Sequence, residues 1–101
     1  MRITHEKVNN TVIISYSGEL GHHEAMQAIK YIENVITLYS PRSLELNLKE
    51  MSFMDSSGIA VIMYGFRNMR EMGADFCVTG TPNQAKKVLC AARLDKLMKI
   101  V

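Results

Sequence analysis

The residues best placed to do chemistry are the four of the segment Asp55-Ser56-Ser57-Gly58. They follow an alternating apolar run at residues 44–48 and precede an apolar run of helical spacing that begins at Ile59. The first backbone N–H groups of a helix have no partner within it, and the helix dipole makes that end electropositive. Such a junction favours an anion, including a phosphate carried by a serine of the turn.

The same residue types also suit an ordinary start of a helix. Ser56 or Ser57 is expected to cap the helix by accepting a hydrogen bond from an N–H two or three residues further on. Gly58 is expected to leave room for the close approach of another backbone or of an anion. Asp55 suits the electropositive end, but it also places a negative charge beside any phosphate. From these residue types alone, simple capping is the commoner use of the turn.

A β-hairpin is predicted at the start of the chain. Residues 2–7 and 11–17 read as strands on either side of Asn9-Asn10, a pair that tolerates the positive φ of a tight turn. Residues 18–21 are expected to break the second strand and to lead into a helix over residues 22–38. The apolar residues expected on one face of the second strand are Val12, Ile14 and Tyr16. The apolar stripe expected on the helix is Ala25, Met26, Ile29, Ile32, Val35 and Ile36.

Strands and helices are expected to alternate through the rest of the chain. A strand over residues 44–48 leads through the central turn into a helix that ends near Met72, with Gly73 as its C-terminal cap. The methionines around that helix are expected to fill the core; they are Met51, Met54, Met63, Met69 and Met72.

A strand over residues 75–80 and a third helix ending near residue 92 are expected next. Thr81 would cap this helix, with Pro82 in its first turn and Gln84 completing a capping box. Its expected buried side is Val88, Leu89 and Ala92, and a last apolar piece spans residues 97–101. The order ββαβαβα(β) predicts one α/β domain over residues 1–101, with a mixed four- to five-stranded sheet flanked by about three to four helices.

Composition and charge exclude several classes of function. Apolar residues make up 48% of the 101, and the net charge is +2 with lysines and arginines scattered, which argues against a nucleic-acid partner. No apolar run has the length of a membrane span and no signal peptide opens the chain, so a bacterial cytoplasmic domain without membrane insertion is expected. Cys77 and Cys90 lack metal-ligand spacing and are expected to be small core residues. No metal or cofactor is expected.

No motif of a catalytic site is present. The chain has no G-x-S-x-G elbow, phosphate-binding loop, dinucleotide fingerprint or zinc pattern. A serine nucleophile at Ser56 would need a fold that brings a histidine near it, so an enzyme is a distant alternative. The pair His22-His23 opens the first predicted helix, where the helix dipole disfavours added positive charge. It reads either as two neutral, solvated side chains or as part of a contact surface.

Two segments resemble the signatures of the STAS domain. They are Ser17-Gly18-Glu19-Leu20 followed by His22-His23, and residues 52–59, Ser-Phe-Met-Asp-Ser-Ser-Gly-Ile. More narrowly, they resemble the anti-sigma factor antagonists of bacteria. The similarity extends through residues 83–89 and residues 94–97, so it covers nearly the whole chain.

The resemblance implies a partner-switching module rather than an enzyme. In that family the unmodified protein binds a serine-kinase anti-sigma factor, which phosphorylates it with ATP, and a metal-dependent serine phosphatase restores it. The matching phosphorylated residue here is Ser56, with Asp55, Ser57 and Gly58 supporting the site. The residues implied or expected to bind the partner are Glu19, Leu20, Gly21, His22, His23, Met54, Ile59, Ala60 and Tyr64.

A switch of this kind is expected to work through charge at the interface. A phosphate adds roughly −1.5 to −2 charges, and free N–H groups at the helix start are expected to hold it without refolding. Losing about 3 kcal/mol of binding free energy, roughly two tenfold steps, would release a modest complex. The remaining alternative is a docking subunit of another regulatory or transporter complex, with Ser56 as a plain cap.

Two departures from the resembled family bear on its partners. Anti-sigma factor antagonists usually carry an aspartate where this chain has Gly21, which indicates a different partner or phosphorylation rate. As a helix cap, glycine replaces aspartate at a cost of only a few tenths of a kcal/mol. Family members also often add a final helix beyond the position of Val101, so an uncovered face and weak self-association are expected.

Overall fold

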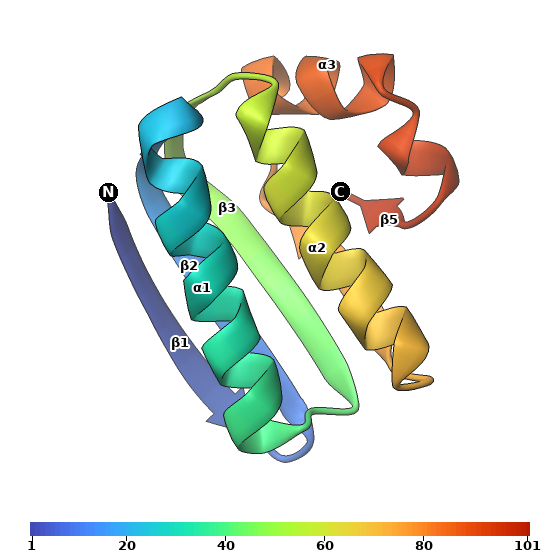
Figure 1. Cartoon of the computed structure of the whole chain (residues 1–101). Helices are drawn as coiled ribbons and strands as arrows, with labels where there is room; N and C mark the ends of the chain where they lie inside the picture. Colours follow the sequence, from blue (N-terminus) through green and yellow to red (C-terminus); the bar gives the residue numbers. More distant parts are fainter.

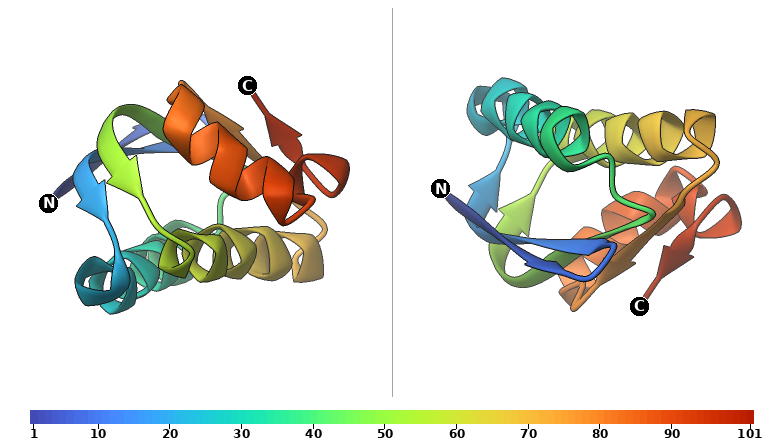
Figure 2. Two further views of the ribbon diagram at one scale, coloured as in Figure 1. Left: turned by 90° about the horizontal axis from the view of Figure 1, so that it is seen from above. Right: turned by 90° about the horizontal axis from the view of Figure 1, so that it is seen from below.

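A mixed five-stranded sheet forms the centre of the computed structural model, which describes all residues 1–101 (Figure 1). The strands lie in the order β1-β2-β3-β4-β5; β1 and β2 pair antiparallel, and the other neighbours pair parallel. Helices α1 and α2 lie side by side on one face, and α3 lies on the other side of the sheet (Figure 2). This confirms the predicted α/β class and the predicted element order. The elements are β1 (Arg2–Val8), β2 (Thr11–Leu20), α1 (His22–Tyr39), β3 (Ser43–Met54), α2 (Ser57–Glu71), β4 (Asp75–Thr79), α3 (Asn83–Ala91), a 3₁₀ turn η1 (Leu94–Lys96) and β5 (Lys99–Ile100).

The N-terminal hairpin forms as predicted, but its second strand is longer than expected. Asn9 takes the positive φ of 57° that the turn requires. Strand β2 continues to Leu20, with shifts of register on both sides of Gly18, whose φ is +99°. The expected break at residues 18–21 is therefore an irregularity within the strand. The strand persists because β3 also runs on, so that Leu20 still has a ladder partner in Met54.

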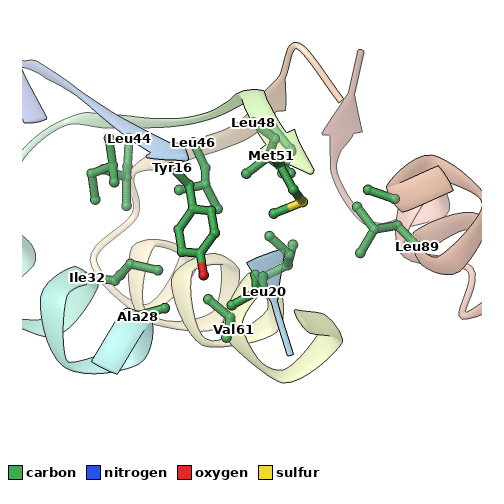
Figure 3. Packing of buried hydrophobic residues seen from close by; sticks show 14 of the residues in the cluster. Tyr16, Leu20, Ala28, Ile32, Leu44, Leu46, Leu48, Met51, Val61 and Leu89 are labelled. Atoms are coloured by element: carbon green, nitrogen blue, oxygen red, sulfur yellow. The ribbon is translucent and has the colours of Figure 1, made fainter. Parts of the chain in front are cut away.

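The core packs the sheet against α1 and α2 on one face and against α3 on the other (Figure 2). The three leucines of β3 alternate inward, and the ring of Tyr16 extends from the sheet toward Ala28 and Val61 (Figure 3). Three of the five predicted core methionines are buried and Met63 is partly buried, whereas Met72 is exposed at the end of α2. The buried hydrophobic residues of the strands are Val12, Ile14, Tyr16, Leu20, Leu44, Leu46, Leu48, Met51, Met54 and Val78.

Helix α1 buries Ala28, Ile32 and Val35, with Ala25, Ile29 and Ile36 at the edges of that stripe. The assignment of Met26 to the stripe is wrong, because its side chain is 74% exposed. Residue 26 stands two positions before Ala28, which is about 200° around an α-helix, so it faces away from the sheet.

Helix α2 ends as predicted, but α3 does not begin as predicted. Gly73, with φ +68°, donates to the carbonyl of Arg70, and Ala74 donates to that of Met69, which is a Schellman motif. At α3 no side chain caps the first turn, and Pro82 occupies the N-cap. The predicted capping box is wrong because the Gln84 side chain is bonded to another element.

The buried side of α3 also differs from the prediction. Leu89 is buried as expected, together with Ala85, but Val88 is half-buried and Ala92 is exposed beyond the end of the helix. The two cysteines likewise differ from each other. Cys77 is half-buried, and burial, followed by the charge of Glu45, raises the pKa of its thiol. Cys90 is exposed on α3, so its assignment to the core is wrong. None of the helices combines the length and apolarity needed to cross a membrane.

Candidate functional site

The two sequence signatures meet at one edge of the sheet. Strands β2 and β3 are parallel, so their carboxyl ends lie together, with Leu20 paired to Met54. The backbone N–H of Asp55 donates to the carbonyl of Leu20 over 3.2 Å. Gly21, which starts α1, and Asp55, which leads into α2, are therefore neighbours although they are far apart in the sequence.

Asp55, and not a serine, caps helix α2. Its Oδ1 accepts a hydrogen bond of 2.7 Å from the N–H of Ser57. Ser56 stands at the N-cap with helical backbone angles (φ −63°, ψ −18°), and no serine side chain makes a capping bond. An N-cap side chain usually reaches the helix from extended backbone, which Ser56 does not have. The expectation of serine capping is therefore wrong, and the exposed hydroxyl of Ser56 has no capping role.

The first N–H groups of α2 all have acceptors within the turn. The N–H of Gly58 donates to the carbonyl of Asp55 over 3.0 Å, and that of Ile59 donates to the carbonyl of Ser56 over 3.1 Å. The N–H of Ser57 is likewise bonded to the carboxylate of Asp55, so none of these three amides lacks a hydrogen-bond acceptor. In the unmodified protein these three N–H groups are therefore not free, contrary to the expectation from the sequence.

Gly58 is buried against a side chain rather than open to a ligand. A Cβ at this position would lie 2.5 Å from Cγ and 2.8 Å from Sδ of Met54. Real Cβ atoms do not approach that closely, so any larger residue here would force the buried side chain of Met54 to move. The expectation that Gly58 leaves room for an anion is wrong.

Three carboxylates surround the position where Gly21 lacks a side chain. A Cβ there would lie 3.1 Å from Asp55 Oδ2, 3.4 Å from Glu24 Oε1 and 3.6 Å from Glu19 Oε1. Glu24 Oε1 also accepts a hydrogen bond of 2.9 Å from the N–H of Gly21 and so caps α1. Burial, followed by the charges of Glu24 and Glu19, raises the pKa of nearby Tyr16 to about 12. The turn that carries Ser56 therefore borders an acidic surface.

The predicted partner-binding residues divide by exposure. Glu19, His22, His23 and Ala60 are exposed, and Ile59 and Tyr64 are half-buried. The rings of the two histidines meet edge to face, with centroids 5.6 Å apart. Burial, followed by the charge of Glu33 on α1, raises the pKa of Tyr64.

Three of the predicted contact residues are instead buried. Leu20 is 1% exposed, Met54 is 0% exposed, and Gly21 is also buried. Their assignment to direct partner contact is wrong, because the parallel ladder draws the ends of β2 and β3 into the core. These three residues lie in the protein interior next to the turn that carries Ser56.

The role of Gln84 in the site was not predicted from the sequence. The side-chain amide of Gln84 bonds both backbone groups of Met54, at 2.8 Å and 2.7 Å. The spacing from Thr81 to Gln84 indicated a capping box, which concealed this role. The only signal was that residues 83–89 belong to the part of the chain that resembles the STAS family.

Comparison with known proteins agrees with this fold. The sequence matches the STAS domain over residues 2–101, so the chain belongs to the STAS domain family. Within that family its sequence and fold are similar, at modest identity, to those of the anti-sigma factor antagonists. The anti-sigma F factor antagonist of Paenibacillus polymyxa is 28% identical over 100 residues, covering 99% of this chain and 86% of that protein.

Two solved structures extend the similarity. The anti-sigma factor antagonist SpoIIAA in its unphosphorylated form matches with a TM-score of 0.84 and 26% identity, over 99% of this chain and 88% of that one. The Bacillus cell fate determinant SpoIIAA in the phosphorylated form matches with a TM-score of 0.76 and 26% identity, over 99% and 91% of the two chains.

Proposed function

We propose that this protein is a bacterial, cytoplasmic partner-switching regulator of the anti-sigma factor antagonist type. While Ser56 is unmodified it binds a serine-kinase anti-sigma-type protein, and phosphorylation of Ser56 by that partner releases it. A metal-dependent serine phosphatase returns it to the binding form. The observation that carries the proposal is that Ser56 is an exposed residue, without a capping bond, in a turn that the carboxylate of Asp55 caps.

The geometry of the turn suits a kinase substrate. Phosphoryl transfer depends mainly on placing the attacking hydroxyl in line with the phosphate, so an accessible and ordered serine is required. Ser57 is less exposed than Ser56, and its N–H is bonded to Asp55. The relation to SpoIIAA, of which both an unphosphorylated and a phosphorylated form have been solved, supports the assignment.

The charges around the turn account for release. A phosphate adds roughly −1.5 to −2 charges. The first amides of α2 already have acceptors, and Asp55, Glu19 and Glu24 make the neighbourhood negative. The phosphate would therefore keep its water and its charge at the surface. A docked partner would have to remove that water, which weakens binding.

The partner surface is formed by the beginnings of α1 and α2. Ser56, Ala60 and Tyr64 are spaced four residues apart, so they lie on one face of α2. The two helices lie side by side (Figure 1), which brings His22 and His23 of α1 to the same end of the molecule. The exposed Glu19 precedes them at the end of β2.

The test combines phosphorylation with binding. The protein is incubated with ATP and the serine-kinase anti-sigma-type protein of its own host, and its intact mass and modified site are determined. We expect one phosphate on Ser56, present in Ser57→Ala and absent from Ser56→Ala. The affinity for the partner should fall at least about 100-fold on phosphorylation, which corresponds to roughly 3 kcal/mol.

Two outcomes would contradict the proposal. Equal affinity of the partner for the modified and unmodified forms would exclude a phospho-switch. Absence of phosphate under every growth condition, with Ser56→Ala still active, would instead favour a docking subunit that binds its partner permanently.

A further inference from the structure

Helix α3 is hydrogen-bonded through Gln84 to Met54. Met54 directly precedes the turn of residues 55–57, called here the Asp55 turn. Gln84 Nε2 donates to the carbonyl of Met54 over 2.7 Å, and the N–H of Met54 donates to Gln84 Oε1 over 2.8 Å. These two residues are 30 positions apart in the chain. A side-chain amide has the same donor and acceptor as a peptide group, so the pair reproduces the bonding of a neighbouring strand.

That bonding fills a gap in the sheet. Strand β3 runs from Ser43 to Met54, but β4 pairs with it only from Ser43 to Asn47. At Met54 the ladder has β2 on one side and no strand on the other. An unpaired backbone N–H or carbonyl in a buried position is costly, and Gln84 satisfies both groups at once.

Met54 contacts Gly58 through its side chain and is followed directly by Asp55. The Met54 side chain is fully buried and passes under Gly58, where a Cβ would be only 2.5 Å away. The next residue is Asp55, whose carboxylate holds the N–H of Ser57. The two hydrogen bonds of Gln84 therefore act on the residue directly before the turn that carries Ser56.

We propose that Gln84 is a positioning residue for Ser56. By holding the end of β3, it keeps the Asp55 turn in one orientation and so presents the Ser56 hydroxyl to the kinase. The link to phosphorylation rests on the proposed function, whereas the ordering of the turn does not.

The competing explanation is that Gln84 only anchors α3. The burial of α3 makes this testable, because Ala85 and Leu89 are both completely buried and hold the helix without the amide. If Gln84 positions the turn, its loss should loosen Met54 and Ser57 while α3 stays in place. If it anchors the helix, α3 itself should loosen.

The first experiment measures amide hydrogen exchange by NMR in Gln84→Ala. The matched control is Gln27→Ala, which makes the same change at an exposed position of α1. We expect the amides of Met54 and Ser57 to exchange about 10- to 30-fold faster in Gln84→Ala, as for the loss of two neutral hydrogen bonds. The amides of Leu46 and Leu89 should keep their protection. Unchanged exchange at Met54 and Ser57, or an equal loss of protection at Leu89, would overturn the proposal.

A second variant gives a signature that a general loss of stability would not. Gln84→Glu keeps an acceptor for the N–H of Met54, but its ionised carboxylate has no donor for the Met54 carbonyl. Protonation, near pH 4.3 for an ordinary glutamate, restores that donor. We expect the protection factor of Met54, whose N–H bonds residue 84 and not the Asp55 carboxylate, to be low at pH 7 in Gln84→Glu and to recover toward pH 4, with no such recovery in Gln84→Ala. Absence of this recovery would count against the proposal.

The functional measurement is the rate of Ser56 phosphorylation by the serine-kinase partner. For Gln84→Ala we expect kcat/KM to fall about tenfold, with Gln27→Ala unchanged. A wild-type rate in Gln84→Ala would overturn the positioning role. If the wild-type protein itself receives no phosphate, the proposed function fails, and the exchange measurements still decide whether Gln84 orders the turn.

Discussion

Asp55 accepts a hydrogen bond of 2.7 Å from the N–H of Ser57, and this single contact sets the roles of both serines in the turn. Since the carboxylate caps α2, the hydroxyl of Ser56 is left exposed at the N-cap. The residue that orders the turn and the residue proposed to be modified are therefore adjacent but different.

Substitutions at these two positions should separate capping from switching. We expect Asp55→Ala to lower the free energy of unfolding by about 1 kcal/mol, the usual loss when a capping side chain is removed. Ser56→Ala should change it by less than about 0.5 kcal/mol, as for an exposed residue without a structural partner. Urea unfolding measures both, and Asp55→Asn, which keeps an acceptor, serves as the control. A larger loss in Ser56→Ala than in Asp55→Ala would contradict this assignment of the cap.

Replacement of Gly58 should be costly because of the Met54 side chain. A Cβ would lie 2.5 Å from Cγ of Met54, and we expect Gly58→Ala to cost about 1–3 kcal/mol of stability through overpacking. The same substitution should cost less in a Met54→Ala background, where the obstructing atoms are gone. Thermal unfolding of the four proteins of this cycle gives the coupling between the two sites. Additive effects would show that the obstruction lies elsewhere.

A charged side chain at position 21 should meet repulsion. The site of a Cβ there lies within 3.6 Å of oxygens of Asp55, Glu24 and Glu19. We expect Gly21→Asp to be less stable than Gly21→Asn by about 1 kcal/mol at pH 7, as for like charges near 4 Å in a well-solvated site. The difference should shrink toward pH 4, as carboxylates become protonated. Urea unfolding at the two pH values checks this, and a constant difference would argue against repulsion.

Alkaline pH should destabilise the fold through Tyr16. Burial raises the pKa of this phenol from its ordinary value of about 10 to about 12. Between these values the unfolded chain loses the proton that the folded chain keeps. The contribution of this phenol to the free energy of unfolding is therefore complete below pH 10. It decreases as the pH rises toward 12, by up to about 1.4 kcal/mol per pH unit for one proton. Unfolding between pH 9 and 11.5 should show a shallower decline in Tyr16→Phe than in the wild type; equal slopes would contradict the assignment.

A permanent negative charge at Ser56 should imitate release of the partner. We expect Ser56→Asp to bind the serine-kinase partner about tenfold more weakly than Ser56→Asn, which has nearly the same shape without the charge. Raising the salt concentration should reduce this difference in affinity between the two variants, because exposed charges are screened. Calorimetric titration at two ionic strengths tests both statements. Equal binding of the two variants would mean that charge at this position does not control the complex.

Local sequence alone determined the order of the elements and several of their ends. Alternation of the leucines in β3 predicted its buried face, because successive side chains of a strand point to opposite faces. Asn9 and Gly73 were found from the sequence because each takes a positive φ that few residue types accept. The apolar run of helical spacing that begins at Ile59 placed Ser56 at the start of a helix, where the structure has it.

Only the tertiary structure decided which groups serve the turn. Gln84 looked like part of a capping box, but α3 packs where its amide meets Met54, 30 residues away. Leu20 and Met54 looked like contact residues, and their pairing at the ends of parallel strands buries them. Patterns of a few residues encode local conformation, whereas the partner of a polar group depends on how distant elements pack against one another.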